Sequence, residues 1–145
     1  MIDSIALWHR RARENPTYDD FRVQLGCHLE EMAEFLEEVA FQDVPNQEKL
    51  MWTIDLLFSM SEALKCKVAV VDINNRENFL KELCDGIVTG IGVGYCNGMA
   101  VISAVEEVNR SNWSKFNYKG FPEFDKRGKI KKGENYSPAD MKGMT

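Results

Sequence analysis

The sequence has few of the residues from which disulfide frameworks and zinc centres are built. It has only two histidines, His9 and His28, and its four cysteines lie far apart without a Cys-x-x-Cys pair. Zinc sites and small disulfide-rich domains need such residues in close, regular spacing. We therefore exclude a disulfide framework and a zinc centre, and expect free thiols at all four cysteines: Cys27, Cys66, Cys84 and Cys96.

Long apolar runs and internal repeats are also missing. No stretch approaches the ~18–20 apolar residues needed to cross a bilayer, and residues 1–15 have neither the apolar segment nor the cleavage site of a secretory signal. The 145 residues, 44% hydrophobic and 28% charged, are instead typical of one globular domain. We expect a single domain over residues 1–145, no membrane partner and a cytoplasmic location.

Charge of one sign is unevenly distributed along the chain. Residues 1–109 carry nine Lys and Arg against nineteen Asp and Glu, whereas residues 110–145 carry nine against four. Such a chain could bind a metal ion with its acidic body and phosphates with its basic tail, or hold nucleic acid through the tail alone. Aromatic residues interleaved with the lysines argue against a disordered tail.

Apolar periodicity predicts helices over most of the first 111 residues. The expected helices run from about 3 to 15, 17 to 41, 47 to 64, 76 to 97 and 101 to 110, with Asp3 or Ser4 as the first cap. Residues 66–72 are expected to form a loop or a brief extended piece. We predict an all-α bundle with a helical body (residues 1–111) and a long irregular basic C-terminal segment (residues 112–145).

A cluster of carboxylates lies in the second expected helix. Five glutamates fall within nine residues: Glu30, Glu31, Glu34, Glu37 and Glu38. At 100° per residue, Glu31, Glu34 and Glu38 share one stripe. That stripe continues towards the N-terminus through the apolar Cys27 and Val23, unlike a purely solvated face. Like charges at this spacing repel one another, so a bound cation and a solvated acidic face are the two interpretations.

A second carboxylate pair, Glu82 and Asp85, lies three residues apart in the fourth expected helix. Together the two helices would offer an all-oxygen ligand set, which Mg²⁺ or Mn²⁺ prefers, whereas zinc and di-iron sites usually recruit Cys or His. Mg²⁺ held by carboxylates keeps open positions for water and phosphates. The two pairs therefore indicate hydrolysis of a phosphoanhydride.

Glycines recur every four residues directly after this second pair: Gly86, Gly90, Gly94 and Gly98. Each glycine inside a helix costs ~0.8–1 kcal/mol relative to alanine, so such a series needs a structural reason. Close approach of another backbone or of a flat ligand is that reason. Helix packing, within the subunit or across a dimer, and a nucleoside lying against the helix are both open.

The carboxylates resemble a known motif. Glu30-Glu31-x-x-Glu34 followed by Glu82-x-x-Asp85 resembles the motif of the all-α nucleoside triphosphate pyrophosphohydrolases, which include MazG-like proteins, phosphoribosyl-ATP pyrophosphohydrolase and dimeric dUTPases. The C-terminal motif of phage and bacterial MazG-like enzymes resembles three further stretches: residues 107–116, 128–130 and 132–138. The resemblance covers about residues 20–40 and 78–140.

The resemblance implies an activity and an assembly. The reaction would be (d)NTP plus water to (d)NMP plus diphosphate, in the control of bacterial or phage nucleotide pools. A deoxynucleotide such as dGTP is favoured, as in the MazZ-type dGTP-specific branch of the family. More than one Mg²⁺ or Mn²⁺ ion, a homodimer or homotetramer, and the cytoplasm of a bacterium or of a phage-infected host are also implied.

Residue roles follow from the same resemblance. Glu31, Glu34, Glu82 and Asp85 match the metal ligands, and Glu30 matches the activator of the attacking water.

Basic and polar residues of the tail complete the expected site. Lys115 would neutralise phosphate oxygens as a catalytic cation, with Arg110 and Lys132 in support. Asn112 and Tyr136 are the expected nucleoside contacts.

Two other classes of function compete with this interpretation. A carboxylate-bridged di-iron bundle needs Glu-x-x-His pairs, but His28 precedes the glutamates and no such pair exists. A non-enzymatic helical module that binds nucleic acid or a partner through its basic tail is the main alternative. The acidic body disfavours nucleic acid as its ligand.

Overall fold

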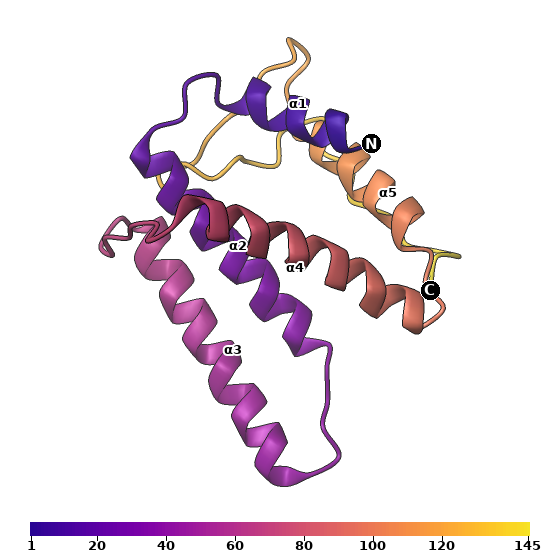
Figure 1. Cartoon of the computed structure of the whole chain (residues 1–145). Helices are drawn as coiled ribbons and strands as arrows, with labels where there is room; N and C mark the ends of the chain where they lie inside the picture. The colour runs from indigo at the N-terminus through magenta and orange to yellow at the C-terminus, as the bar shows by residue number, and fades with distance from the viewer. The chain divides into compact units, whose positions relative to one another are not determined.

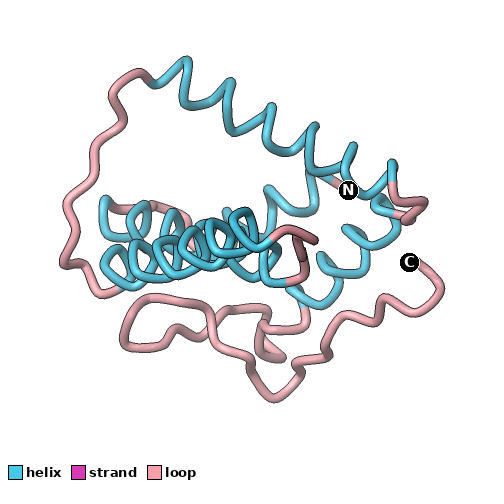
Figure 2. Tube along the Cα trace, turned by 90° about the horizontal axis from the view of Figure 1, so that it is seen from below, coloured by secondary structure: helices cyan, strands magenta, loops and turns pink.

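The computed structural model describes all residues from 1 to 145 and is entirely helical apart from its loops (Figures 1 and 2). Its helices account for 60% of the chain, with no strands. They are α1 (Ile2–Ala12), α2 (Tyr18–Glu37), α3 (Val44–Lys65), α4 (Arg76–Cys96) and α5 (Val101–Trp113). The all-α prediction is confirmed at this level.

The chain divides into two compact units. Unit 1 comprises Met1–Glu14, Asp72–Glu123 and Ile130–Thr145, and unit 2 comprises Asn15–Val71 and Phe124–Lys129. Unit 1 therefore holds α1, α4, α5 and most of the C-terminal segment, and unit 2 holds α2, α3 and one short turn. The single-domain organisation of residues 1–145 stays a prediction.

Unit 2 is a helical hairpin in which α2 and α3 pack side by side and run antiparallel (Figure 1). Small side chains allow this close packing. A Cβ atom added at Gly26 would lie 2.9 Å from both the carbonyl oxygen of Ser61 and Cγ of Lys65, so an alanine does not fit there without a shift. Ala33 of α2 is fully buried, and Val23 and Leu64 are nearly so. The start of α2 is fixed by a reciprocal capping box between Thr17 and Asp20.

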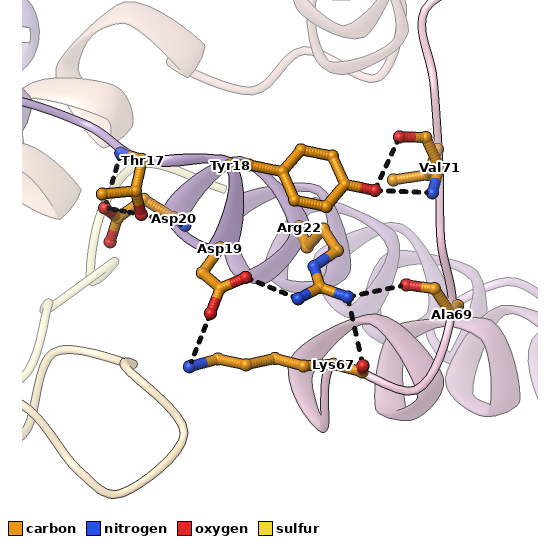
Figure 3. A network of polar contacts seen from close by, with 8 residues as sticks. All are labelled: Thr17, Tyr18, Asp19, Asp20, Arg22, Lys67, Ala69 and Val71. Carbon is orange, nitrogen blue, oxygen red and sulfur yellow. Dashed lines mark hydrogen bonds and ion pairs between the residues drawn. The ribbon is translucent and has the colours of Figure 1, made fainter.

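A polar network holds the loop after α3 against the start of α2 (Figure 3). The guanidinium of Arg22 donates to the carbonyl oxygens of Lys67 and Ala69, at 3.1 and 3.2 Å, and pairs with Asp19. The Tyr18 hydroxyl accepts from the backbone N–H of Val71 at 2.9 Å and donates to its carbonyl. Because backbone groups of the loop are bonded by side chains of α2, this segment is fixed without being a strand.

Unit 1 is organised around aromatic side chains. Trp8 of α1 stacks on Phe116, and Trp113 of α5 meets the same ring edge-on, with ring centroids 5.8 and 5.4 Å apart. The Ser4 hydroxyl accepts hydrogen bonds from Asn109 at 2.9 Å and from the Trp113 indole at 3.1 Å. These contacts join α1 to the end of α5 across about a hundred residues of sequence.

The helix α4 contrasts with the rest because none of its residues is buried. Large apolar side chains such as Leu80 (60% exposed), Ile87 (59%) and Val88 (67%) face solvent. Its C-terminal end meets the start of α5 at a shallow apolar pocket. No single helix is long and apolar enough to cross a membrane; α4 and α5 together would be, but the pair is bent by 119°.

Several predicted helix boundaries are wrong, for local reasons. The first helix begins at Ile2 and has no side-chain cap, so neither Asp3 nor Ser4 caps it. The second ends at Glu37 rather than about residue 41. The third begins at Val44, because Asp43 caps it and Pro45 fits the first turn, where no N–H partner is needed.

Other boundaries agree more closely. The fourth helix, expected over residues 76–97, ends one residue earlier, at Cys96. The fifth continues past Arg110 to Trp113. Residues 66–72 form a loop, as predicted.

Candidate metal and nucleotide site

The acidic face of α2 carries two of the four predicted metal ligands. Glu31 and Glu34 are exposed, and neither side chain makes an ion pair or a hydrogen bond. Residues three apart in a helix are surface neighbours. Unit 2 therefore presents two adjacent carboxylates without a counter-cation.

Glu30, beside that pair on α2, contacts α3 and the turn at residues 124–129. Its Oε1 accepts a hydrogen bond from Lys65 Nζ at 2.9 Å, and its Oε2 accepts one from Lys129 Nζ at 2.7 Å. Burial alone would raise the pKa of Glu30, but the hydrogen bonds from Lys129 and Lys65 hold the pKa below its ordinary value. Both oxygens of this anion are already engaged.

Lys65 is the centre of a cluster of charges. It is only 4% exposed, and besides Glu30 it pairs with Glu62 at 2.7 Å. Arg127 pairs with the second oxygen of Glu62, also at 2.7 Å. We call these four residues, together with Lys129, the Lys65 cluster. Burial would lower the pKa of Lys65, but its two carboxylate partners raise the pKa above the ordinary value.

Sequence reasoning missed the Lys65 cluster. Glu62 and Lys65 are spaced for an ion pair within one helix, and Gly26 on α2 leaves room for the lysine stem. Those two signals were present. Nothing local predicts Lys129, which lies 99 residues beyond Glu30.

The second predicted carboxylate pair lies on α4, in unit 1. Lys81 Nζ contacts Glu82 Oε1 at 3.0 Å and Asp85 Oδ2 at 2.7 Å. All three side chains are more than half exposed. The hydrogen bonds to Asp85 and then to Glu82 raise the pKa of Lys81. One positive charge thus lies between two carboxylate oxygens.

This arrangement fits a divalent cation in chemical terms. The Lys81 ammonium shows that oxygens of Glu82 and Asp85 can converge on a single cation from one helix face. Carboxylate oxygens are the donors that Mg²⁺ and Mn²⁺ prefer. Two donors are fewer than such an ion needs, so further ligands must come from water, substrate or another acidic pair.

The four predicted ligands are divided between the two units. Glu31 and Glu34 belong to unit 2, and Glu82 and Asp85 belong to unit 1. No group of three or more His, Cys, Asp or Glu side chains is placed to hold a metal ion. That the two pairs share ions stays a prediction.

Among the predicted phosphate contacts, Arg110 is strongly engaged within unit 1. It makes two hydrogen bonds to the Glu107 carboxylate, at 2.7 and 2.8 Å, and donates to the Pro138 carbonyl at 2.9 Å. Arg110 and then the backbone N–H of Asp140 lower the pKa of Glu107 to about 2. Arg110 thereby fixes the C-terminal segment to α5.

Lys115 and Asn112 lie together where α5 ends. Lys115 Nζ donates to Asn112 Oδ1 at 2.7 Å, and the Asn112 carbonyl accepts from the Trp8 indole at 2.9 Å. A Cβ atom added at Gly133 would lie 3.1 Å from the Lys115 carbonyl oxygen, so the later part of the segment passes close to this turn. The structure therefore brings Lys115 and Asn112 together and places the residues around Gly133 beside them.

Lys132 and Tyr136 form the remaining predicted contact pair. The Lys132 ammonium lies over the Tyr136 ring, 4.9 Å from its centroid. The hydroxyl of Ser114 accepts from the backbone N–H of Ser137 at 2.8 Å and so ties this stretch to the end of α5. All five predicted substrate-contact residues thus belong to unit 1: Arg110, Asn112, Lys115, Lys132 and Tyr136.

Comparisons with known proteins give no relatives. No protein-family model, curated protein or solved structure matches the chain.

Proposed function

We propose that this protein is a metal-dependent nucleoside triphosphate pyrophosphohydrolase that converts a (d)NTP and water into a (d)NMP and diphosphate. The observation that carries the proposal is the pair of helices that each expose two carboxylates three residues apart. On α2, Glu31 and Glu34 have no counter-cation, and on α4 the partners Glu82 and Asp85 hold a single positive charge between them. The resemblance of these residues to the family motif supports the same activity.

In this proposal the four carboxylates, Glu31, Glu34, Glu82 and Asp85, hold Mg²⁺ or Mn²⁺. When bound, such an ion neutralises phosphate charge and lowers the pKa of a water ligand. The chain's own contribution is to supply oxygen donors from two rigid helices. Helix positions define ligand geometry more closely than loop positions do.

The cationic residues of unit 1 serve the substrate. A nucleoside triphosphate carries nearly four negative charges, and an acidic site repels it unless cations offset them. Lys115, with Arg110 and Lys132, supplies those charges, while Asn112 and Tyr136 contact the nucleoside. The contact of Lys115 with Asn112 keeps an ammonium group beside a neutral amide, which supports this division of roles.

Assembly is part of the proposal. The exposed apolar side chains of α4 would be costly to leave in water at about 25 cal/mol per Å². Two-fold assemblies are the commonest solution for such surfaces. We propose a homodimer or homotetramer in the cytoplasm, with α4 at the interface.

The test is direct. The purified protein is incubated with each of the four NTPs and four dNTPs plus dUTP, with Mg²⁺ or Mn²⁺, and products are resolved by anion-exchange chromatography. We expect monophosphate and diphosphate in equal amounts, with dGTP or another deoxynucleotide favoured, and no turnover in excess EDTA. The Glu34→Gln variant controls for a contaminating hydrolase. No turnover of any nucleotide by the folded protein overturns the proposal and favours the non-enzymatic binding module.

A further inference from the structure

The carboxylate of Glu30 links three parts of the chain: α2, α3 and the 124–129 turn. Its two oxygens reach different cations: Lys65 of α3 at 2.9 Å and Lys129 of the 124–129 turn at 2.7 Å. The Glu30 side chain is 17% exposed and that of Lys65 is 5% exposed, whereas that of Lys129 is 46% exposed. One partner is therefore buried and the other lies at the surface.

The 124–129 turn has its own internal structure. The Asp125 carboxylate accepts hydrogen bonds from the backbone N–H groups of Arg127 and Lys129, each at 2.9 Å. Gly128 has a φ of 86°, which favours glycine. Because the turn is shaped by these bonds, the two side chains that leave it, Arg127 and Lys129, project from a defined loop.

Those two side chains make both of the turn's long-range ion pairs, Arg127 with Glu62 and Lys129 with Glu30. The Arg127–Glu62 pair is exposed on both sides, at 42% and 49%. Exposed pairs contribute little. The Lys129–Glu30 pair involves a carboxylate that is itself held by a buried ammonium, so it is the stronger attachment.

Each oxygen of Glu30 accepts a hydrogen bond from an ammonium group, one from α3 and one from the 124–129 turn. We propose that Glu30 is a positioning residue: it joins Lys65 to Lys129, and thereby anchors the 124–129 turn to the α2–α3 hairpin.

In sequence, the turn is flanked by residues 115–123 and 130–136, which include the proposed substrate contacts Lys115, Lys132 and Tyr136. Anchoring the turn restricts the conformations open to both flanks. This part of the inference rests on the proposed function, whereas the anchoring itself does not.

The experiment compares Glu30→Gln and Lys129→Met, with Glu37→Gln as the matched control. Glu37 is an exposed glutamate of the same helix without any ion pair. Trypsin cuts after Lys126 and Arg127, and mass spectrometry measures the rate of cleavage there. We expect on the order of tenfold faster cleavage in both anchoring variants, wild-type cleavage in Glu37→Gln, and near wild-type cleavage in Lys129→Arg.

Kinetics on the preferred triphosphate supply the second readout. We expect Glu30→Gln and Lys129→Met each to raise KM several-fold with kcat within about twofold of wild type, and the double variant to equal either single one. The positioning role is overturned if Glu30→Gln loses kcat while its cleavage rate and its KM stay at wild-type values and Lys129→Met also behaves like wild type. If Glu30→Gln fails to fold, the Lys129→Met and Lys129→Arg arms decide alone.

Failure of the proposed function is separable. If the wild-type protein hydrolyses no nucleotide, the cleavage rates still confirm or overturn the anchor. If cleavage at the turn is the same in all variants, the anchor is wrong whatever the enzyme does.

Discussion

The helices α2 and α4 each carry a carboxylate pair, but the two regions are built differently. The α2 helix is packed against α3, and the cations around Glu30 come from distant parts of the chain. The α4 helix has no buried residue, and the cation between its carboxylates is the adjacent Lys81. Tertiary packing thus determines which cations pair with Glu30 of α2, whereas the local sequence determines which cation pairs with the carboxylates of α4.

The difference shows which carboxylates are held in structural ion pairs and which are available to bind an external cation. Glu30 and Glu62 are held by charges that the fold brings to them. Glu31 and Glu34 have no such partners, and the Lys81 contacts are exposed and therefore weak. The most available carboxylates for an external cation lie on α2, and those of α4 become available once Lys81 moves.

The largest effect is expected from the proposed metal ligands. Glu31→Gln, Glu34→Gln and Asp85→Asn should each lower kcat on the order of 10³-fold, because a lost ligand forfeits several kcal/mol of charge stabilisation. Helix content by circular dichroism should be unchanged. Thermal stability of the metal-free Glu31→Gln and Glu34→Gln proteins should rise slightly, since like charges on α2 no longer repel. Equal turnover with and without EDTA would contradict the metal model for both helices.

The comparison of the two lysines comes next. Lys65→Met should lower the free energy of unfolding by about 3 kcal/mol, because it leaves Glu30 and Glu62 without their buried partner. Lys81→Met removes an exposed cation and should change it by less than about 0.5 kcal/mol. Urea unfolding followed by circular dichroism measures both. Equal losses in the two variants would show that burial does not distinguish these clusters.

Lys115→Ala tests the substrate side of unit 1. We expect a loss on the order of 10²-fold in kcat/KM, the scale of removing one preorganised charge-stabilising group. The loss should persist at saturating metal and be larger for triphosphate turnover than for monophosphate binding. Lys119→Ala, a neighbouring lysine whose ammonium lies over the Tyr118 ring, is the control. Unchanged kinetics in a folded Lys115→Ala protein would move the phosphate contact to Arg110 or Lys132.

The smallest expected effect concerns pH and the Glu107–Arg110 pair. The pKa of Glu107 is lowered from its ordinary 4.5 to about 2 by Arg110 and by the Asp140 N–H. A lowered pKa stabilises the fold above the unfolded-state value, and this contribution disappears as the pH falls from about 4.5 through about 2. The free energies of unfolding of wild type and Glu107→Gln, measured between pH 6 and pH 2.5, should therefore converge at the acidic end. A constant difference would contradict the assignment.

The sequence predicted elements whose signals are local. The start of α2 follows from Thr17 and Asp20, and α4 runs from Arg76 to Cys96 as its periodicity indicates. The start of α3 lies before the expected residue 47, because Pro45 occupies the first turn of the helix, which tolerates proline. Ser4 was interpreted as a cap, but its hydroxyl accepts from α5 residues over a hundred positions away.

The same division applies to the candidate site. The spacing of Glu31 with Glu34, and of Glu82 with Asp85, is a property of each helix and needs no tertiary information. The partners of Glu30 could not be predicted, because Lys65 and Lys129 lie 35 and 99 residues away. Ion pairs between residues so far apart in the chain depend on how the helices pack. No local pattern in a single sequence predicts that packing.

Unit 2 is assembled from two segments that are far apart in the sequence, and this affects the order in which the chain can fold during synthesis. Its hairpin is complete once residue 71 has been synthesised, but Phe124–Lys129 belong to the same unit. During synthesis on the ribosome, the ion pair between Glu30 and Lys129 therefore cannot form until most of unit 1 has been translated. In that interval the hairpin carries its acidic charge uncompensated by the turn. Completion of unit 2 is therefore a late folding step that needs a long-range contact. Chains that end before residue 129 have the hairpin but lack the ion pair between Glu30 and Lys129.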